Sequence, residues 1–550
     1  MNHTSFAILG LLVVTLGAGA YAMRPAPVEQ IPPTASAGDL TLKECTIKLD
    51  SGRYAADCGT LIVPENRARA QSRLISLPVI RIRATGANPT EPIFYLNGGP
   101  GLSNMLAQPP AGMLARHDFI MIGYRGVDGA VVLDCPEITQ ATKGDGIDVL
   151  NERSRLGTME ASRRCAQRLQ REGVDLDGYT MDEVAADIDA GRAAFGYERI
   201  HLLSASYGTR VAQIYAYLYR SHLYRSVMVG VNPPGGFVWE PDIIDAQIQE
   251  YARLYAQSEN PRTPNLAESI RSVAQDMPER WLFFRIDPGK VKSLSFAMLF
   301  QRGSSALVFD AFLAAEQGDP SGLALMSMAY DYVLPGMFVY GDFFSKGVSP
   351  DFDPGRDYFK QMDPPGSIIG SPLSRLIMGS AAEDGQLIWP TRAIAPELRQ
   401  VQPSDVETLL VSGNLDFSTP AQNATKNLLP SLSRGQQVIL SDMGHVSDLL
   451  NWQPEASERL LVSFFETGAA DDALFEHLPM DFEVKLGFPM LAKLALVFAA
   501  LVVPAAVGGV WLVMRRVRPL MKRRWWGGSR AKEWLAEVQG HGQASQESTG

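Results

Sequence analysis

The chain has 550 residues, of which 46% are hydrophobic and 20% are charged, and its formal net charge is −10 at pH 7. This length and composition can bury one large core with an accessory layer, and they exclude a disordered protein. An acidic chain is also a poor partner for nucleic acid, so we expect no nucleic-acid binding.

An apolar segment, 6–20, is followed by Ala20-Tyr21-Ala22, a small-x-small sequence of the kind that signal peptidase cleaves. We therefore expect residues 1–22 to be a signal peptide. No Lys or Arg precedes the apolar segment, which is atypical, so an uncleaved N-terminal anchor is the alternative. Residues 23–40 predict a proline-rich linker without helix or strand periodicity.

The apolar run 92–96 is typical of a buried strand and leads into Asn97-Gly98-Gly99-Pro100-Gly101. Glycines allow a backbone N–H to approach a substrate carbonyl closely. Donors aimed at a developing oxyanion are often the largest catalytic contribution in acyl transfer. We expect the backbone N–H of Gly99 to be one such donor.

A second apolar run, 200–205, breaks at Ser206 and opens onto a helical pattern from Tyr207. A serine on a sharp strand-to-helix turn, with Gly208 two residues later, is typical of a nucleophile elbow. The backbone N–H of Tyr207 is then the second expected oxyanion donor. Ser204 is the alternative nucleophile, but it has no glycine at the same spacing.

Two further strand patterns, 408–412 and 437–440, deliver Asp416 and His445 just past their ends. The chain order Ser206, Asp416, His445 is that of the α/β-hydrolase triad and differs from the order in other serine proteases. We expect His445 to take the proton of Ser206, and Asp416 to hold the tautomer of that imidazole.

These patterns predict an α/β fold with a mostly parallel central sheet, built from residues 41–236 and 401–470. The strand pattern 226–231 is the last before a long insertion, 237–400, which we interpret as a helical cap. Helical periodicity in the cap is expected over 240–258, 265–277, 296–316 and 320–332. Caps of this kind bind the part of the substrate that does not react.

Residues 494–514 contain no charged side chain and are long enough to span a bilayer as one helix. The tail 515–550 carries eight Lys and Arg and three Glu, which leaves the rest of the chain with a net charge of −15. The positive-inside rule predicts a basic cytoplasmic tail and an extracytoplasmic hydrolase, periplasmic or at the cell surface. A buried core helix is the alternative for 494–514.

Over about residues 41–467 the chain resembles the α/β-hydrolase serine peptidases that include prolyl iminopeptidases and bacterial tripeptidyl aminopeptidases. Ser204, Asn97 and the segment 123–130 depart from the usual family pattern. The motifs that carry the resemblance are Asn97–Gly101, Tyr124–Gly126, Tyr179–Asp187, Ser204–Thr209, Asp416–Pro420 and Gly444–His445.

The resemblance implies release of amino acids or short peptides from free N-termini. An exopeptidase has to recognise an ammonium group, for which a partly desolvated carboxylate is suited. Glu383 and Asp384, on the return from the cap, are the first candidates. Glu240, at the cap entrance, is the next. The alternative for each is a solvated loop charge.

Four cysteines, Cys45, Cys58, Cys135 and Cys165, have no metal-ligand spacing, and disulfides are the natural interpretation. Of three pairings we favour Cys45–Cys58 and Cys135–Cys165. These close short loops, and the resembling family has cysteines at similar places.

The sequence therefore predicts a membrane-anchored extracytoplasmic serine hydrolase, an exopeptidase acting through an acyl-enzyme on a peptide or small ester substrate. A carboxylesterase or lipase of the same fold is one alternative, and a non-catalytic binding protein is another. No metal or other cofactor is expected, since no metal-binding motif is present.

Overall fold

A computed structural model describes residues 31–501 of the chain. Residues 31–489 belong to one compact unit, and the helical residues 490–501 belong to a second. Within 31–501, no helix has the length and apolar character that crossing a membrane requires. The expected signal peptide, residues 502–514 of the predicted span and the tail 515–550 lie outside the described residues, so the anchor stays a prediction.

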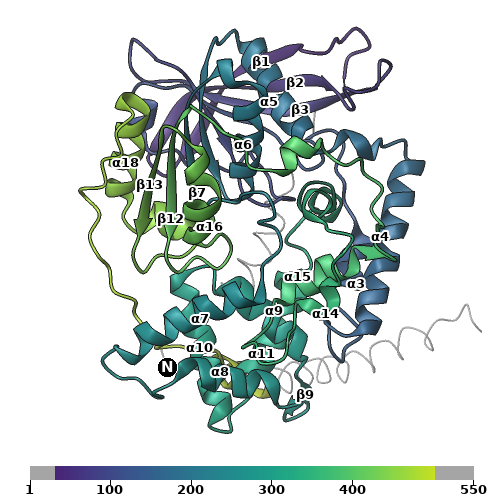
Figure 1. The fold of residues 1–550 in the computed structure, drawn as a ribbon, viewed down its shortest axis with the longest axis vertical. Helices are drawn as coiled ribbons and strands as arrows, with labels where there is room; N and C mark the ends of the chain where they lie inside the picture. Colours follow the sequence, from purple (N-terminus) through teal and green to yellow (C-terminus); the bar gives the residue numbers. More distant parts are fainter. Residues whose placement is uncertain (1–30, 502–550) are drawn as a thin grey trace, which may run out of the picture. The chain divides into compact units, whose positions relative to one another are not determined.

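A nine-stranded sheet forms the centre of the first unit, in the order β1-β2-β3-β5-β4-β6-β7-β12-β13 (Figure 1). The first four strands in this order pair antiparallel, and from β5 to β13 every pairing is parallel. The mostly parallel sheet expected from the sequence is therefore confirmed. Its strands are β1 (Leu40–Leu49), β2 (Gly52–Pro64), β3 (Leu74–Ile82), β4 (Ile93–Leu96), β5 (Phe119–Ile122), β6 (Ile200–Ala205), β7 (Leu223–Val229), β12 (Glu407–Gly413) and β13 (Gly435–Leu440).

Two hydrophobic clusters pack on the two faces of this sheet. In β4, Phe94 and Leu96 belong to the first cluster and Ile93 to the second, and in β6 Leu202 and Leu203 divide in the same way. Successive strand residues point to opposite faces, so continuous apolar runs are what a doubly covered sheet requires. The flanking helices are α2 (Ala111–Leu114), α3 (Pro136–Ala141), α4 (Glu152–Arg171), α5 (Met181–Phe195), α6 (Tyr207–Leu218), α16 (Ala421–Asn423), α17 (Ser447–Asn451) and α18 (Pro454–Thr467).

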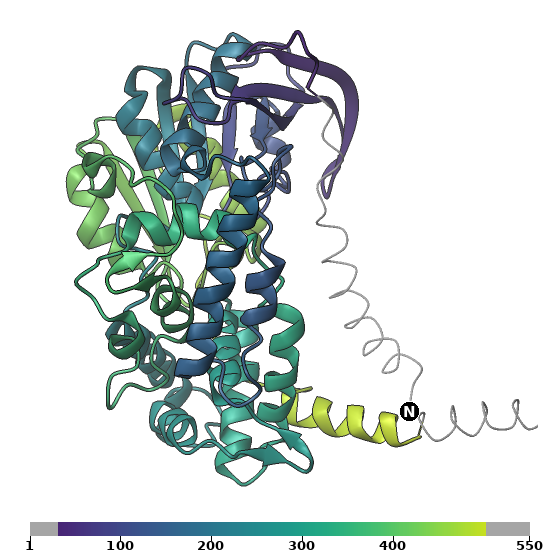
Figure 2. The same cartoon turned by 90° about the vertical axis from the view of Figure 1, so that its right-hand side faces the viewer.

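Helices and two small hairpins occupy the interval between β7 and β12, and Figure 1 shows α7–α11 grouped at one side of the sheet. Figure 2 shows the β1–β3 end of the sheet (purple) far from these helices (teal). We interpret this interval as the cap. Its elements are α7 (Pro241–Ala256), α8 (Leu266–Gln275), β8 (Arg280–Trp281), β9 (Phe284–Arg285), α9 (Pro288–Met298), α10 (Arg302–Glu316), α11 (Ser321–Val333), α12 (Tyr340–Phe343), the π-helix η3 (Phe344–Val348), α13 (Ser349–Asp351), α14 (Tyr358–Gln361), α15 (Pro372–Ile377), β10 (Ala382–Glu383) and β11 (Gln386–Leu387).

One cap helix differs from its sequence prediction. The periodicity of 296–316 predicts one helix, but the structure has two, α9 and α10, which are separated at 299–301. The carbonyl of Phe300 accepts a hydrogen bond from the backbone N–H of His445 at 2.7 Å. A tertiary contact with the loop after β13 therefore competes with continuation of the helix, and local periodicity does not reveal it.

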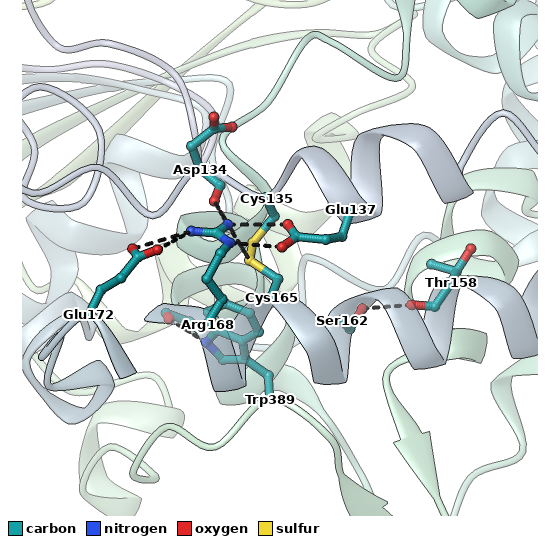
Figure 3. Close-up of a disulfide and its surroundings, with 10 residues drawn as sticks. Asp134, Cys135, Glu137, Thr158, Ser162, Cys165, Arg168, Glu172 and Trp389 are labelled. Atoms are coloured by element: carbon teal, nitrogen blue, oxygen red, sulfur yellow. Dashed lines mark hydrogen bonds and ion pairs between the residues drawn. A yellow bond between two sulfur atoms is a disulfide. The ribbon is translucent and has the colours of Figure 1, made fainter. Parts of the chain in front are cut away.

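The pairs Cys45–Cys58 and Cys135–Cys165 are both disulfide-bonded, as expected. Figure 3 shows the second bond, which joins the start of α3 to the middle of α4. Arg168 lies beside it and donates to the Asp134 carbonyl at 2.7 Å and to the Glu137 carboxylate at 2.8 Å. The bond thus fixes the segment that enters α3.

Candidate active site

Ser206 lies at the turn between β6 and α6, with φ 51° and ψ −121°. Such a φ is unfavourable for any residue except glycine, and it persists where the surroundings enforce it. Here the Ser206 N–H donates to the carbonyl of Val229 in β7 at 2.8 Å. A Cβ at Gly208 would lie 2.2 Å from the Leu96 carbonyl oxygen, so only glycine allows α6 to start this close to β4.

Asp416 follows β12 and is fully buried. One carboxylate oxygen accepts the backbone N–H groups of Ser418 and Thr419, both at 2.8 Å. The other accepts the Thr419 hydroxyl and the Nδ1 of His445, also at 2.8 Å. An ionised carboxylate can only accept, so Nδ1 carries the proton and Nε2 keeps its lone pair free.

His445 and Ser206 approach the same residue, Gly230, which directly follows Val229. A Cβ at Gly230 would lie 3.1 Å from His445 Cε1, and Val229 holds the Ser206 N–H. The Phe300 ring packs against the imidazole with 5.7 Å between ring centroids. Ser206, His445 and Asp416 are therefore brought to one edge of the sheet, where parallel strands end.

The predicted oxyanion donors lie on both sides of Ser206. Tyr207 is the first residue of α6, so its N–H has no intrahelical acceptor. Gly99 has φ +126° and precedes a cis peptide bond to Pro100. Its neighbour Gly98 brings the loop over the serine, because a Cβ there would lie 3.1 Å from Ser206 Cβ.

Two of the motifs that carry the family resemblance, Tyr124–Gly126 and Tyr179–Asp187, contribute to a buried hydrogen-bond network next to this loop. Arg125 is fully buried and donates to both oxygens of Asp187, each at 2.6 Å. Tyr124, next to it, donates through its hydroxyl to the Asn97 carbonyl at 3.0 Å. The motifs Tyr124–Gly126 and Tyr179–Asp187 therefore contribute buried side chains that support the loop 97–101.

A buried ion pair in the cap, which the sequence analysis did not identify, holds the same loop. Asp342 and Lys346 have no exposed side-chain surface and bond to each other. Asp342 accepts the Gly101 N–H at 3.0 Å, and Lys346 Nζ donates to the Arg125 carbonyl at 2.7 Å. We call this pair the cap clamp.

Burial raises the pKa of Asp342 and lowers the pKa of Lys346, and each charge opposes the shift of the other. Two buried charges have to remain paired, because removal of one leaves the other uncompensated. Two backbone hydrogen bonds beside the cap clamp strengthen this contact. The Val339 N–H donates to the Gly101 carbonyl at 3.0 Å, and the Gly341 N–H donates to the Leu133 carbonyl at 3.1 Å. Leu133 lies two residues before the disulfide cysteine Cys135. Only their spacing of four residues links Asp342 and Lys346 in the sequence, and that spacing is common on helices.

The three candidate carboxylates for ammonium binding lie elsewhere. Glu383 is exposed on the β10–β11 hairpin and pairs with Arg163 at 2.7 Å. Asp384 occupies the turn of that hairpin with φ 50° and lines a cavity of about 490 Å³ together with Arg155. Glu240 accepts both terminal nitrogens of Arg356, at 2.6 and 3.0 Å. Within residues 31–501 none of the three bonds to a triad residue, so their role stays a prediction.

In the described part of the chain, no group of three His, Cys, Asp or Glu side chains is arranged to hold a metal ion.

Comparison with known proteins gives one matching family model and several similar peptidases. Residues 91–275 match the family model for the alpha/beta hydrolase fold. The tripeptidyl aminopeptidase of Streptomyces coelicolor is 26% identical over 250 residues, and the serine protease Hip1 of Mycobacterium tuberculosis is 27% identical over 224 residues. These alignments cover 42% and 37% of this chain. The chain spans less than half of each relative, 46% and 40% of their lengths.

The fold and the similar proteins together identify this chain as a serine hydrolase. The chain has the α/β-hydrolase fold, and it is similar to a tripeptidyl aminopeptidase and to a serine protease.

Proposed function

We propose that this protein is a membrane-anchored, extracytoplasmic exopeptidase that releases amino acids or short peptides from free N-termini. The observation that carries the proposal is the strained elbow at Ser206 beside a histidine whose Nδ1 is bound to a buried carboxylate. The names of the similar peptidases support peptides as the substrate class.

In the proposed reaction, His445 Nε2 takes the proton of Ser206 as Oγ forms a bond to the scissile carbonyl carbon. The carbonyl oxygen gains the negative charge and accepts the N–H groups of Gly99 and Tyr207. When the C–N bond breaks, the imidazolium returns the proton to the leaving amine. Water then attacks the acyl-enzyme by the same route.

A panel of peptide amides tests the activity. We expect cleavage of di-, tri- and tetrapeptide amides with a free amine and loss of cleavage after acetylation of that amine. Acyl esters serve as the comparison. Cleavage that is indifferent to acetylation contradicts the exopeptidase, and turnover of acyl esters alone favours the esterase. Absence of covalent labelling by a fluorophosphonate favours a binding protein.

Location is tested separately. Two disulfides support an oxidising compartment, because such bonds are rare in the cytosol. The uncharged stretch 494–514, followed by a basic tail, supports the anchor. We expect the full chain to stay in the membrane pellet after alkaline carbonate extraction. Release into the supernatant contradicts the anchor without affecting the proposed chemistry.

A further inference from the structure

The tip of the β8–β9 hairpin is apolar and exposed. Arg280 and Trp281 pair with Arg285 and Phe284, and a two-residue turn, Leu282-Phe283, joins the strands. Leu282 is 58% exposed and Phe283 is 74% exposed. Together they form the apolar tip.

The two-residue turn does not require apolar side chains at Leu282 and Phe283. Leu282 has φ 53°, a conformation that favours Gly, Asn or Asp, which are the usual residues of tight hairpin turns. Leucine there adds backbone strain, and its exposure adds unfavourable hydration. Because neither cost contributes to forming the hairpin, the residues of the apolar tip need an explanation outside the local fold.

The base of the hairpin is aromatic and its flanks are basic. Trp281 stacks on Phe284 with centroids 5.8 Å apart, and Phe283 lies 4.4 Å from Phe284. The two arginines, Arg280 and Arg285, are exposed. Aromatic rings and long cationic side chains around an apolar point are the composition that the interfacial layer of a bilayer accepts.

The position of the hairpin in the chain is also consistent with contact to a bilayer. β8 and β9 pack against α11, a helix that also carries Tyr332 at 86% exposure. The first unit ends at Pro489, whose carbonyl accepts the hydroxyl of Ser321, the first residue of the same helix, at 3.3 Å. Only four residues, 490–493, separate Pro489 from the uncharged stretch that begins at 494, so these two positions are at most about 18 Å apart.

We propose that Leu282 and Phe283 insert into the lipid–water interface of the membrane and that Arg280 and Arg285 contact its anionic headgroups. The proposal rests on the proposed C-terminal anchor, which keeps α11 within reach of the bilayer. The hairpin then acts as a second contact that fixes how the cap faces the membrane.

A site-specific fluorophore tests this on the full chain in nanodiscs of phosphatidylcholine and phosphatidylglycerol. All four native cysteines are in disulfides, so one introduced cysteine is the only thiol. Phe283→Cys, Leu156→Cys on α4 and Val497→Cys in the predicted span each receive an NBD label. Lipids that carry a nitroxide near the headgroup are the quencher.

We expect the labels at positions 283 and 497 to lose most of their fluorescence and the label at 156 to keep it, although Leu156 is 48% exposed. Quenching at 497 with none at 283 overturns the hairpin proposal and leaves the anchor standing. Absence of quenching at both positions overturns the anchor and the hairpin proposal together.

Hydrogen exchange of residues 279–286 gives a second measurement without a label. We expect slower exchange in nanodiscs than in detergent for the native chain, and no slowing for Leu282→Ser/Phe283→Ser. That variant keeps the proposed catalytic groups, so its cleavage of soluble peptide amides should be unchanged. Equal exchange of native chain and variant in nanodiscs contradicts the insertion.

Discussion

Ser204 and Ser206 are two residues apart and have opposite roles in the structure. Ser204 is fully buried, and its hydroxyl donates to the Val227 carbonyl at 3.0 Å. Ser206 lies at the elbow and is partly exposed. A hydroxyl that is bonded inside the sheet is unavailable for attack, whereas one at an exposed turn is available, so the geometry favours Ser206 as the nucleophile.

Replacement of each serine by alanine separates them. We expect Ser206→Ala to abolish covalent labelling by a fluorophosphonate, because the attacking oxygen is gone. Ser204→Ala is the matched control and should keep labelling, with a loss of about 1 kcal/mol of stability for the missing hydrogen bond. Labelling that survives in Ser206→Ala and disappears in Ser204→Ala would reverse the assignment.

The Asp416–His445 pair predicts a defect in kcat. Asp416→Asn keeps the size of the side chain but allows an amide N–H to face His445, which favours the wrong imidazole tautomer. We expect kcat to fall by about 10⁴-fold while KM changes little, as measured with a peptide amide. A change confined to KM would place Asp416 outside the proton transfer.

His201 predicts how stability depends on pH. Its ring is buried in β6 and both nitrogens lack a partner among the described residues. Burial lowers the pKa of His201 to about 2, so between pH ~6.5 and about 2 the unfolded chain binds a proton that the folded chain does not. The free energy of unfolding therefore falls as the pH falls through this range.

We expect His201→Phe to remove this contribution, which amounts to about 1.4 kcal/mol per pH unit below pH ~6.5. Urea unfolding of both proteins at pH 7, 6 and 5 measures it, because the carboxylates common to both proteins cancel in the difference. A difference between the two proteins that does not vary with pH would contradict the linkage.

At the scale of elements, the cap clamp connects α12 and η3 to the loop 97–101. Asp342→Asn removes one charge and leaves Lys346 buried and unpaired, so we expect a large loss of stability, about 3–5 kcal/mol. We also expect a lower kcat, because the Gly101 N–H loses a charged acceptor and the predicted oxyanion donor, the Gly99 N–H, loses its position. Asp331→Asn, in the partly exposed Lys290 pair, is the control.

A double variant separates positioning from folding. Asp342→Leu/Lys346→Met removes both charges, and replacement of a buried pair by apolar residues is often neutral for stability. We expect thermal unfolding near that of the native chain together with a reduced kcat and a nearly unchanged KM. Native kcat in this variant would mean that the clamp only stabilises the fold.

Each disulfide joins two secondary-structure elements, and we expect the two bonds to differ in their contributions to stability and to kcat. In the chain-entropy model, Cys135–Cys165 closes a 30-residue separation and contributes about 3.5 kcal/mol, against about 3 kcal/mol for Cys45–Cys58 at 13 residues. We expect Cys135→Ala/Cys165→Ala to be the less stable variant in urea. It should also lower kcat, since Leu133 beside it contacts Gly341 of the clamp segment. Cys45→Ala/Cys58→Ala, in the β1–β2 pair, should leave kcat unchanged.

For the whole molecule, the sequence predicts the parallel half of the sheet well. Runs such as 92–96 and 408–412 are apolar throughout, which identifies strands covered on both faces, and the ends of such strands lie at one edge. The positions of Ser206, Asp416 and His445 therefore follow from pattern and order. The pairing of Cys135 with Cys165 follows from loop length together with the family resemblance.

Long-range contacts set the limit of that prediction. The bond from His445 to Phe300 divides a periodic helical stretch, and Asp342 meets Gly101 across 241 positions of sequence. No local signal marks either contact. Glu383 and Asp384 are predicted from charge and position in the chain alone, and these two properties do not distinguish a solvated hairpin turn from a substrate contact, so their role stays a prediction.

The elbow at Ser206 has a further consequence for the folded state as a whole. A backbone held at φ 51° with a side chain stores about 1 kcal/mol or more that a glycine would release. Ser206→Gly should therefore unfold at a higher temperature than the native chain while having no nucleophile. At position 206 the proposed activity requires serine, whereas conformational stability favours glycine. We therefore expect glycine at this position in homologues that have lost the activity.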